Sequence, residues 1–240
     1  MAKILSGKIV SARVKDELKK EVEELSQRGK QTGLAVVLVG DDSASKVYVR
    51  NKEKACEEVG IYSEVHRLSA NTSEEELLKL INELNENDKI DGILVQLPLP
   101  KHLDDKVIID NIKPEKDVDA FHPSNVGKIM IGDYDFLPCT PAGIMELIHE
   151  SGVEVDGKTC VVIGRSNIVG KPMSMLLLHE NGTVTTCHSH TKNLAEVTKS
   201  ADILVAAVGI PKFVKADMVK PGAVVIDVGM DRDENGKLCG

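Results

Sequence analysis

Apolar and polar positions along the chain follow two different periods. Near the amino terminus the apolar side chains recur at helical spacing, at Val10, Val14, Leu18, Val22 and Leu25. This spacing predicts a long helix that ends near Gly29. The elements predicted next are a strand at 34–39, a helix at 43–59, a strand at 62–68, a helix opened by the capping box of 73–76 and a strand at 92–96. Such an alternation indicates a parallel sheet with flanking helices.

The second half of the chain repeats the same alternation. Strands are predicted at 159–163, 183–187, 203–206 and 224–228, with a helix at 169–178 and a short helix after Asn193. Between the halves, residues 113–141 contain several prolines, glycines and aspartates, and we expect them to be irregular. We therefore predict two α/β domains, at 1–140 and 141–240.

A glycine turn joins the strand at 159–163 to the helix that follows it. Gly164 begins the turn and Gly170 ends it, so backbone N–H groups and the positive end of a helix point at one place. The spacing departs from the dinucleotide fingerprint G-x-G-x-x-G, because Ser166 replaces the second glycine and Gly170 comes one residue late. It is not a Walker-type phosphate loop either, since Pro172 replaces the magnesium-binding hydroxyl residue. The turn alone leaves two interpretations open, a Rossmann-like dinucleotide site and an ordinary strand-to-helix turn.

The composition excludes several classes of protein. The net charge is −8, which argues against nucleic acid as a main partner. No apolar run is long enough for a membrane helix, and the amino terminus lacks the pattern of a signal peptide, so we expect no membrane partner. The five cysteines are widely spaced and include no C-x-x-C pair. We expect them to be reduced thiols of a cytoplasmic protein rather than zinc ligands or disulfide partners.

Side chains suited to chemistry occur together in the first half. Tyr48 and Lys52 share one helix face, where a phenol can hold an amine that exchanges protons. Gln96 follows a buried strand at the carboxyl edge of the predicted sheet, where such folds bind ligands. Asp117 and Asp119 lie in a loop. Each has a plainer interpretation as well: a solvated lysine, a glutamine that satisfies loop backbone, and aspartates that cap turns.

Four segments of the chain are distinctive when taken together. They are Ser45-Lys-Val-Tyr-Val-Arg-Asn-Lys52, Asp91-Gly-Ile-Leu-Val-Gln-Leu-Pro-Leu-Pro100, Pro114-Glu-Lys-Asp-Val-Asp-Ala-Phe121 and Gly164-Arg-Ser-Asn-Ile-Val-Gly-Lys-Pro172. From Leu5 onward, the chain resembles the bifunctional methylenetetrahydrofolate dehydrogenase/methenyltetrahydrofolate cyclohydrolase family. Four motifs in one order are much more specific than any one of them, so the resemblance favours the functional interpretations over the plainer ones.

The resemblance implies a catalytic folate site in the first domain. Such enzymes oxidise 5,10-methylenetetrahydrofolate with NADP to the 5,10-methenyl form and then hydrolyse it to 10-formyltetrahydrofolate. Lys52 would be the acid–base group of the hydrolysis, Tyr48 would orient Lys52 and pack on the aminobenzoyl ring, and Gln96 would hydrogen-bond Lys52. Asp119 would bind the two N–H donors of the pterin edge. The other substrate-binding residues implied are Ser45, Leu97 and Pro98.

The resemblance implies an NADP site in a Rossmann-like second domain. The residues that would shape the cofactor turn are Gly164, Ser166 and Gly170. The strand at 183–187 is followed by no carboxylate of the kind that holds the ribose 2′-hydroxyl of NAD. Arg165 and Ser189 would instead hold the 2′-phosphate of NADP. His188 and His190 could form a metal pair, but solvent-exposed loop histidines are the better interpretation, and we expect no metal.

The resemblance also bears on assembly and on completeness. It implies a homodimer formed through the cofactor domain. The family normally continues with a Pro-Gly-Gly-Val-Gly-Pro stretch and a final helix, so we expect this C-terminal tail to be absent from the chain. Two alternatives follow, a folate- or nucleotide-binding module without catalysis and a fragment with impaired dehydrogenase activity. A short-chain dehydrogenase, which also uses a Tyr-x-x-x-Lys pair, is disfavoured because here the pair precedes the glycine turn.

Overall fold

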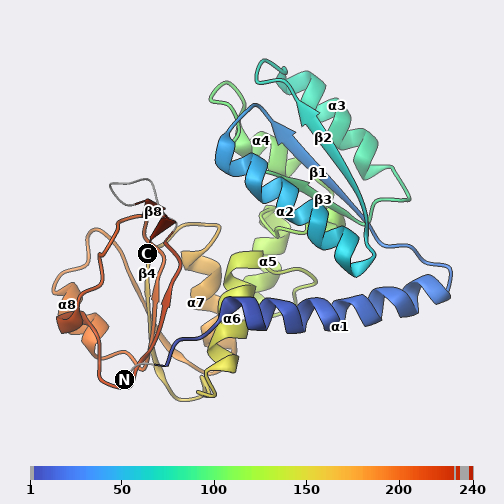
Figure 1. Cartoon of the computed structure of the whole chain (residues 1–240). Coiled ribbons are helices and arrows are strands. Elements are labelled where there is room, and N and C mark those ends of the chain that lie inside the picture. Colours follow the sequence, from blue (N-terminus) through green and yellow to red (C-terminus); the bar gives the residue numbers. More distant parts are fainter. Residues whose placement is uncertain (1–2, 230, 233–237, 240) are drawn as a thin grey trace. The chain divides into compact units, whose positions relative to one another are not determined.

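The chain forms two compact units, each with a parallel sheet (Figure 1). The computed structural model describes residues 3–229, 231–232 and 238–239. One unit spans residues 8–127, and the other joins the amino-terminal residues up to Gly7 with the chain from Lys128 onward. The two-domain α/β fold predicted from the sequence is therefore present, while the division of roles expected at residue 140 stays a prediction.

The unit at 8–127 contains a three-stranded sheet of order β2-β1-β3. Its strands are β1 (Gly33–Val39), β2 (Tyr62–Leu68) and β3 (Gly92–Val95), and its helices are α1 (Gly7–Gln27), α2 (Ser43–Val59), α3 (Glu74–Asn85) and α4 (Asp105–Asp110), with a 3₁₀ turn η1 at Pro114–Lys116. The capping box predicted for α3 is formed, with Ser73 and Glu76 each accepting the other's backbone N–H. The short helix α4 was not predicted.

β1 is buried on both faces, which explains its unbroken apolar sequence. Ala35 and Val37 belong to a core with α3 and α4, whereas Val36 and Leu38 pack with Val49 of α2 on the opposite face. The sheet is thus fixed between two helical layers. The residues that follow the carboxyl ends of β1 and β3 are positioned by this rigid centre.

The other unit contains a four-stranded parallel sheet of order β5-β4-β6-β7. Its strands are β4 (Thr159–Ile163), β5 (Thr183–Cys187), β6 (Ile203–Ala206) and β7 (Val224–Asp227), its helices are α6 (Cys139–Glu150), α7 (Gly170–His179) and α8 (Leu194–Lys199), and it includes a 3₁₀ turn η2 (Ala216–Met218) and an antiparallel pair, β8 (Asp231–Arg232) and β9 (Leu238–Cys239). Ile148 of α6 and Leu177 of α7 pack on one face of this sheet. Val197 of α8 packs on the other face, so both faces are covered here too.

The stretch at 113–141 is more regular than its composition suggests. Helix α5 (Pro123–Ile131) lies within it, so the expectation of an irregular segment is wrong there. The proline and glycine that suggested a loop mark the ends of the helix. Pro123 is its first residue, and Gly132, which follows the last one, has a φ of +80°.

None of the helices in the described part of the chain has both the length and the apolar character that crossing a membrane requires.

Candidate active site

Lys52 lies on α2 and is held by Gln96, which comes directly after β3. The Lys52 Nζ atom donates a hydrogen bond to Gln96 Oε1 at 3.0 Å. Gln96 is itself fixed, because its backbone N–H donates to Val37 O at 2.9 Å and its Nε2 donates to Leu97 O at 2.8 Å. Since the amide nitrogen serves the Leu97 carbonyl, the amide oxygen is left to accept from the lysine. The hydrogen bond implied by the family resemblance is therefore present.

Tyr48 lies one helical turn before Lys52 and is open to a ligand. Its side chain is 40% exposed, and its hydroxyl forms no hydrogen bond with any residue that the structure describes. The hydrogen-bond partner of Lys52 in the structure is thus Gln96 and not Tyr48. The expected role of Tyr48 in orienting the lysine stays a prediction, while a role for its ring in stacking requires only the exposed face that it has.

Ser45 is buried in the first turn of α2, where it takes part in capping the helix. Its backbone N–H donates to Asp42 Oδ1 at 2.7 Å. Hydrogen bonds from the backbone and side chain of Ser45 lower the pKa of Asp42 below its usual value. In this structure Ser45 therefore contributes to the helix end that carries Tyr48, and its contact with substrate stays a prediction.

Leu97 and Pro98 follow Gln96 in the chain, and the peptide bond between Leu97 and Pro98 is cis. Leu97 packs against the core on the α3 side of the sheet, whereas Pro98 is exposed. Leu97 thus supports the Lys52–Gln96 pair only through its carbonyl oxygen, which accepts from Gln96 Nε2, and the Leu97 and Pro98 side chains lie outside the hydrogen bonds of this pair.

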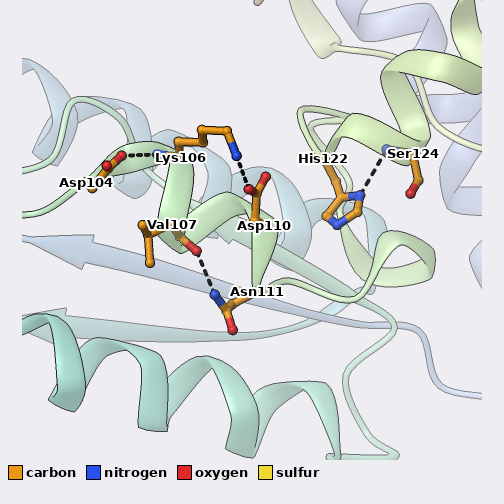
Figure 2. A network of polar contacts seen from close by, with 7 residues as sticks. All are labelled: Asp104, Lys106, Val107, Asp110, Asn111, His122 and Ser124. Atoms are coloured by element: carbon orange, nitrogen blue, oxygen red, sulfur yellow. Dashed lines mark hydrogen bonds and ion pairs between the residues drawn. The ribbon is translucent and has the colours of Figure 1, made fainter.

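Asp117 and Asp119 have different environments although a single residue separates them. Asp117 is buried and accepts hydrogen bonds from the backbone N–H of His122 at 2.8 Å and from Asn125 Nδ2 at 2.9 Å. His122 in turn accepts the backbone N–H of Ser124 on its Nδ1 atom at 3.1 Å (Figure 2). These bonds close the loop at 117–125 onto the start of α5, and Asp117 serves as its structural anchor.

Asp119 is the unpaired acid of this loop. It is partly buried and accepts no hydrogen bond from any residue in the described part of the chain. Loss of solvent raises its pKa to about 6, with the positive charge of Lys52 opposing the rise and the negative charge of Asp117 adding to it. A partly buried carboxylate without a donor favours a ligand that supplies N–H groups.

The glycine turn between β4 and α7 depends on close backbone contacts. Gly164 has a φ of +129°, and a Cβ atom there would lie 2.5 Å from the Ala207 carbonyl oxygen. A Cβ atom on Gly170 would lie 2.3 Å from the Gly164 carbonyl oxygen. Ser166, which replaces the second glycine of the fingerprint, accepts the backbone N–H groups of Val169 and Gly170 on its Oγ atom, each at 3.2 Å. The serine therefore holds the turn closed where it leads into α7, and it does not act as the N-cap of that helix.

Arg165 and Ser189 occupy equivalent places on neighbouring strands. Ile163 pairs with Cys187 in the sheet, and each of the two residues lies two positions beyond that pair at the same edge. Both side chains are exposed, and Arg165 makes no ion pair with any described residue. A compact glycine turn flanked by a free guanidinium and a hydroxyl, without a nearby carboxylate at the end of β5, fits a dinucleotide that carries an additional phosphate.

The histidine pair after β5 has a structural role in its loop. His188 donates its backbone N–H to Thr191 Oγ1 at 2.8 Å and accepts the backbone N–H of His190 on its Nδ1 atom at 3.2 Å. Across the described residues, no group of three or more histidine, cysteine or acidic side chains could hold a metal ion.

Comparison with protein families matches two successive segments of the chain. Residues 5–119 match the tetrahydrofolate dehydrogenase/cyclohydrolase catalytic domain. Residues 138–240 match the NAD(P)-binding domain of the same family.

Individual proteins are similar over the whole chain. The chain is 63% identical over 239 residues to the bifunctional protein FolD of Acetivibrio thermocellus, covering 100% of this chain and 84% of that protein. It is 62% identical over 240 residues to FolD of Lachnoclostridium phytofermentans, covering 100% and 85%.

Solved structures agree with these matches. The bifunctional FolD methylenetetrahydrofolate dehydrogenase/cyclohydrolase of Campylobacter jejuni superposes with a TM-score of 0.95 at 48% identity, covering 98% of this chain and 84% of that one. The Trypanosoma brucei dehydrogenase-cyclohydrolase, solved with NADP and an inhibitor, superposes with a TM-score of 0.94 at 39% identity, covering 100% and 84%.

Proposed function

This chain belongs to the tetrahydrofolate dehydrogenase/cyclohydrolase family, and from this premise we propose how its own residues carry the two reactions. It oxidises 5,10-methylenetetrahydrofolate with NADP and hydrolyses the 5,10-methenyl product to 10-formyltetrahydrofolate. We assign the folate chemistry to the region of Lys52, Gln96 and Asp119. The observation that carries this assignment is the hydrogen bond that fixes Lys52 to the Gln96 amide oxygen, together with the unpaired Asp119 carboxylate, whose pKa is affected by the charge of Lys52.

Substrate binding is assigned first to Asp119 and Tyr48. The exocyclic amine and ring N–H of the pterin present two donors in one plane, which a carboxylate accepts in parallel. These donors would satisfy the carboxylate that the protein leaves unpaired. The exposed Tyr48 ring would stack on the aminobenzoyl group. We further propose that Ser45, Leu97 and Pro98 line the folate site around these two residues.

The hydrolytic step is assigned to Lys52. Water attacks the methenyl carbon and forms a C–O bond, and Lys52 accepts the proton that the water loses. The C–N bond to the departing pterin nitrogen then breaks as the C–OH of the adduct becomes the formyl C=O. The nitrogen takes the proton that Lys52 supplies, and the hydroxyl proton is released to water, which accounts for the positive charge of the methenyl substrate. Gln96 holds the Lys52 nitrogen in place throughout, so we treat Gln96 as a positioning residue.

Cofactor binding is assigned to the turn between β4 and α7. When bound, NADP accepts the hydride of the oxidation. Gly164 and Gly170 let the turn close tightly on its own backbone, and Ser166 keeps the turn in shape. The backbone N–H groups of this turn would bind the pyrophosphate. Arg165 and Ser189 would contact the 2′-phosphate, as their exposed positions at one sheet edge allow.

A spectrophotometric assay with methylenetetrahydrofolate tests the assignment. Formation of reduced cofactor is expected with NADP in preference to NAD. Lys52→Met should abolish hydrolysis of the methenyl substrate while folate still binds, and Lys54→Met, on an exposed position of the same helix, serves as the matched control. Loss of folate binding in Lys52→Met would reassign Lys52 to a structural role. Folate binding without turnover in the parent protein would favour a binding module.

We propose that the enzyme is a homodimer joined through the unit that holds the glycine turn. Support comes from β5, which lies at the edge of its sheet and so has one side that pairs with no neighbouring strand of that sheet. Light scattering after size-exclusion chromatography is expected to give twice the mass of the chain. A mass of one chain at micromolar concentration would contradict this assembly.

We also propose the cytoplasm as the location of the enzyme. Cys56, Cys160 and Cys187 are buried thiols rather than disulfide partners. Burial raises the pKa of each, to about 11 for Cys160, so they stay protonated and unreactive. Reduced cysteines of this kind suit a reducing compartment. Cell fractionation that recovers the enzyme outside the cytoplasm would refute the proposal.

A further inference from the structure

A concave surface lies on the flank of α2 that faces β2. It has a volume of about 330 Å³ and is lined by the cationic side chains of Lys46, Arg50 and Arg67, with Glu53 as its only acid. We call it the basic groove. Asp41, which pairs with Lys46, is a second acid beside it, so the cations outnumber the acids by one. A local excess of positive charge in a chain whose net charge is −8 suits an anionic ligand.

The cations of the basic groove are available to a ligand. Arg67 Nη2 lies 3.2 Å from Glu53 Oε2, and Lys46 Nζ lies 2.6 Å from Asp41 Oδ1, both as exposed pairs. Arg50 forms no hydrogen bond or ion pair with any residue in the described ranges. Exposed pairs of this kind contribute little to stability, so a carboxylate on a ligand can exchange into them.

The basic groove also has apolar walls. Leu38 and Val49 are buried at its base, and Val47 is 46% exposed at its rim. A ligand that alternates carboxylates with methylene groups would use both kinds of contact, whereas a free inorganic anion would use only the charges. Because Tyr48 and Lys52 lie on the same helix, a flexible acidic extension of the substrate could reach the groove from the folate site.

We propose that the basic groove binds the γ-linked glutamyl tail of the folate substrate, an inference that rests on the proposed function. At 100° per residue, Arg50 and Tyr48 are about 160° apart along the shorter arc around α2. Passing along this arc over a helix about 11 Å wide takes about 15 Å. A γ-glutamyl repeat has two more backbone bonds than an ordinary residue and spans about 6 Å. The third glutamate is therefore the first to enter the groove.

Michaelis constants for methylenetetrahydrofolate carrying one, two, three and five glutamates test this proposal. For the parent protein the constant should stay level from one to two glutamates and fall about tenfold by five, which corresponds to about 1.4 kcal/mol. In Arg50→Gln/Arg67→Gln the ratio between the one- and five-glutamate substrates should shrink to about twofold. Lys54→Gln removes one charge from the same helix outside the groove and should keep the full ratio. Raising the salt concentration should reduce the preference in the parent protein.

Three outcomes overturn the proposal. Equal constants for all tail lengths in a parent protein that turns over the monoglutamate would remove the groove from the folate site while leaving the proposed function intact. A preference that survives in Arg50→Gln/Arg67→Gln would place the tail elsewhere. Failure to turn over even the monoglutamate would refute the proposed function and this proposal with it.

Discussion

Replacing Asp119 with asparagine should make the folded protein more stable and a poorer folate binder at the same time. Burial raises the pKa of this carboxyl from 3.8 to about 6. At 1.36 kcal/mol for each pH unit, the ionised form costs the folded state at most about 3 kcal/mol at neutral pH. Because the side chain keeps some contact with solvent, we expect Asp119→Asn to recover about 1–2 kcal/mol.

The pH dependence of this effect has a definite sign. The folded state binds the Asp119 proton more tightly than the unfolded chain does. The contribution of Asp119 to the free energy of unfolding is therefore greatest below about pH 4 and is lost as pH rises through about 6. The gain from Asp119→Asn should therefore be present at pH 7 and nearly vanish at pH 4. Asp117→Asn is the matched control, because Asp117 accepts two internal hydrogen bonds and its replacement should destabilise the protein.

Urea denaturation should be monitored by hydrogen exchange in peptides from β1 and β3. These peptides report the stability of the unit at 8–127, which contains Asp119. A gain of 1–2 kcal/mol corresponds to a rise of about 0.5–1 M in the urea midpoint. Folate affinity, measured by calorimetry on the same samples, should fall. If Asp119→Asn lowers the urea midpoint at pH 7, or raises it equally at pH 4 and pH 7, the carboxylate is not a strained, ligand-directed acid and the reasoning fails.

Three other substitutions follow from the site. Gln96→Met removes the acceptor that fixes Lys52, and hydrolysis should fall about 100-fold while the dehydrogenase rate falls less; equal losses in separate assays would show that Gln96 serves the whole fold. Arg165→Ala should raise the Michaelis constant for NADP far more than that for NAD, and equal effects on both cofactors would remove Arg165 from the phosphate site. Gly170→Ala places a Cβ 2.3 Å from the Gly164 carbonyl oxygen. NADP binding measured by calorimetry should therefore be lost, and the unit that contains the turn should be destabilised by about 1–3 kcal/mol. Retained NADP affinity would show that the backbone of the turn can shift to accommodate the methyl group.

Much of the fold could be predicted from the sequence because its central elements follow simple rules. The bounds of α2, β2, β4 and β5 agree with the sequence-based predictions residue by residue. An unbroken apolar run identifies a strand covered on both faces, and caps identify helix ends. Helix α5 was missed because its proline and glycine were taken as loop residues, although they stand at its two ends.

The candidate site could be predicted only in part. The motifs of the family indicated Lys52, Gln96 and Asp119, but the anchoring of the loop by Asn125 could not be predicted, because its partner Asp117 lies eight residues away outside any helical or strand period. The role of Ser166 in closing the turn was also unexpected. A serine in the place of a glycine suggested a degraded fingerprint, whereas its hydroxyl accepts two backbone donors at the start of α7.

The fixed orientation of the Gln96 amide has a consequence for turnover. Its oxygen faces Lys52 because its nitrogen is engaged by the Leu97 carbonyl. A lysine nitrogen has a hydrogen to offer this oxygen whether it is an ammonium or a neutral amine, so the contact persists through both halves of a proton exchange. In the acid–base role that we propose for it, the lysine would accept and return a proton without changing its rotamer, and no reorganisation of the protein would have to accompany each cycle. The amide oxygen of Gln96 can thus accept a hydrogen bond from Lys52 in either protonation state of the lysine.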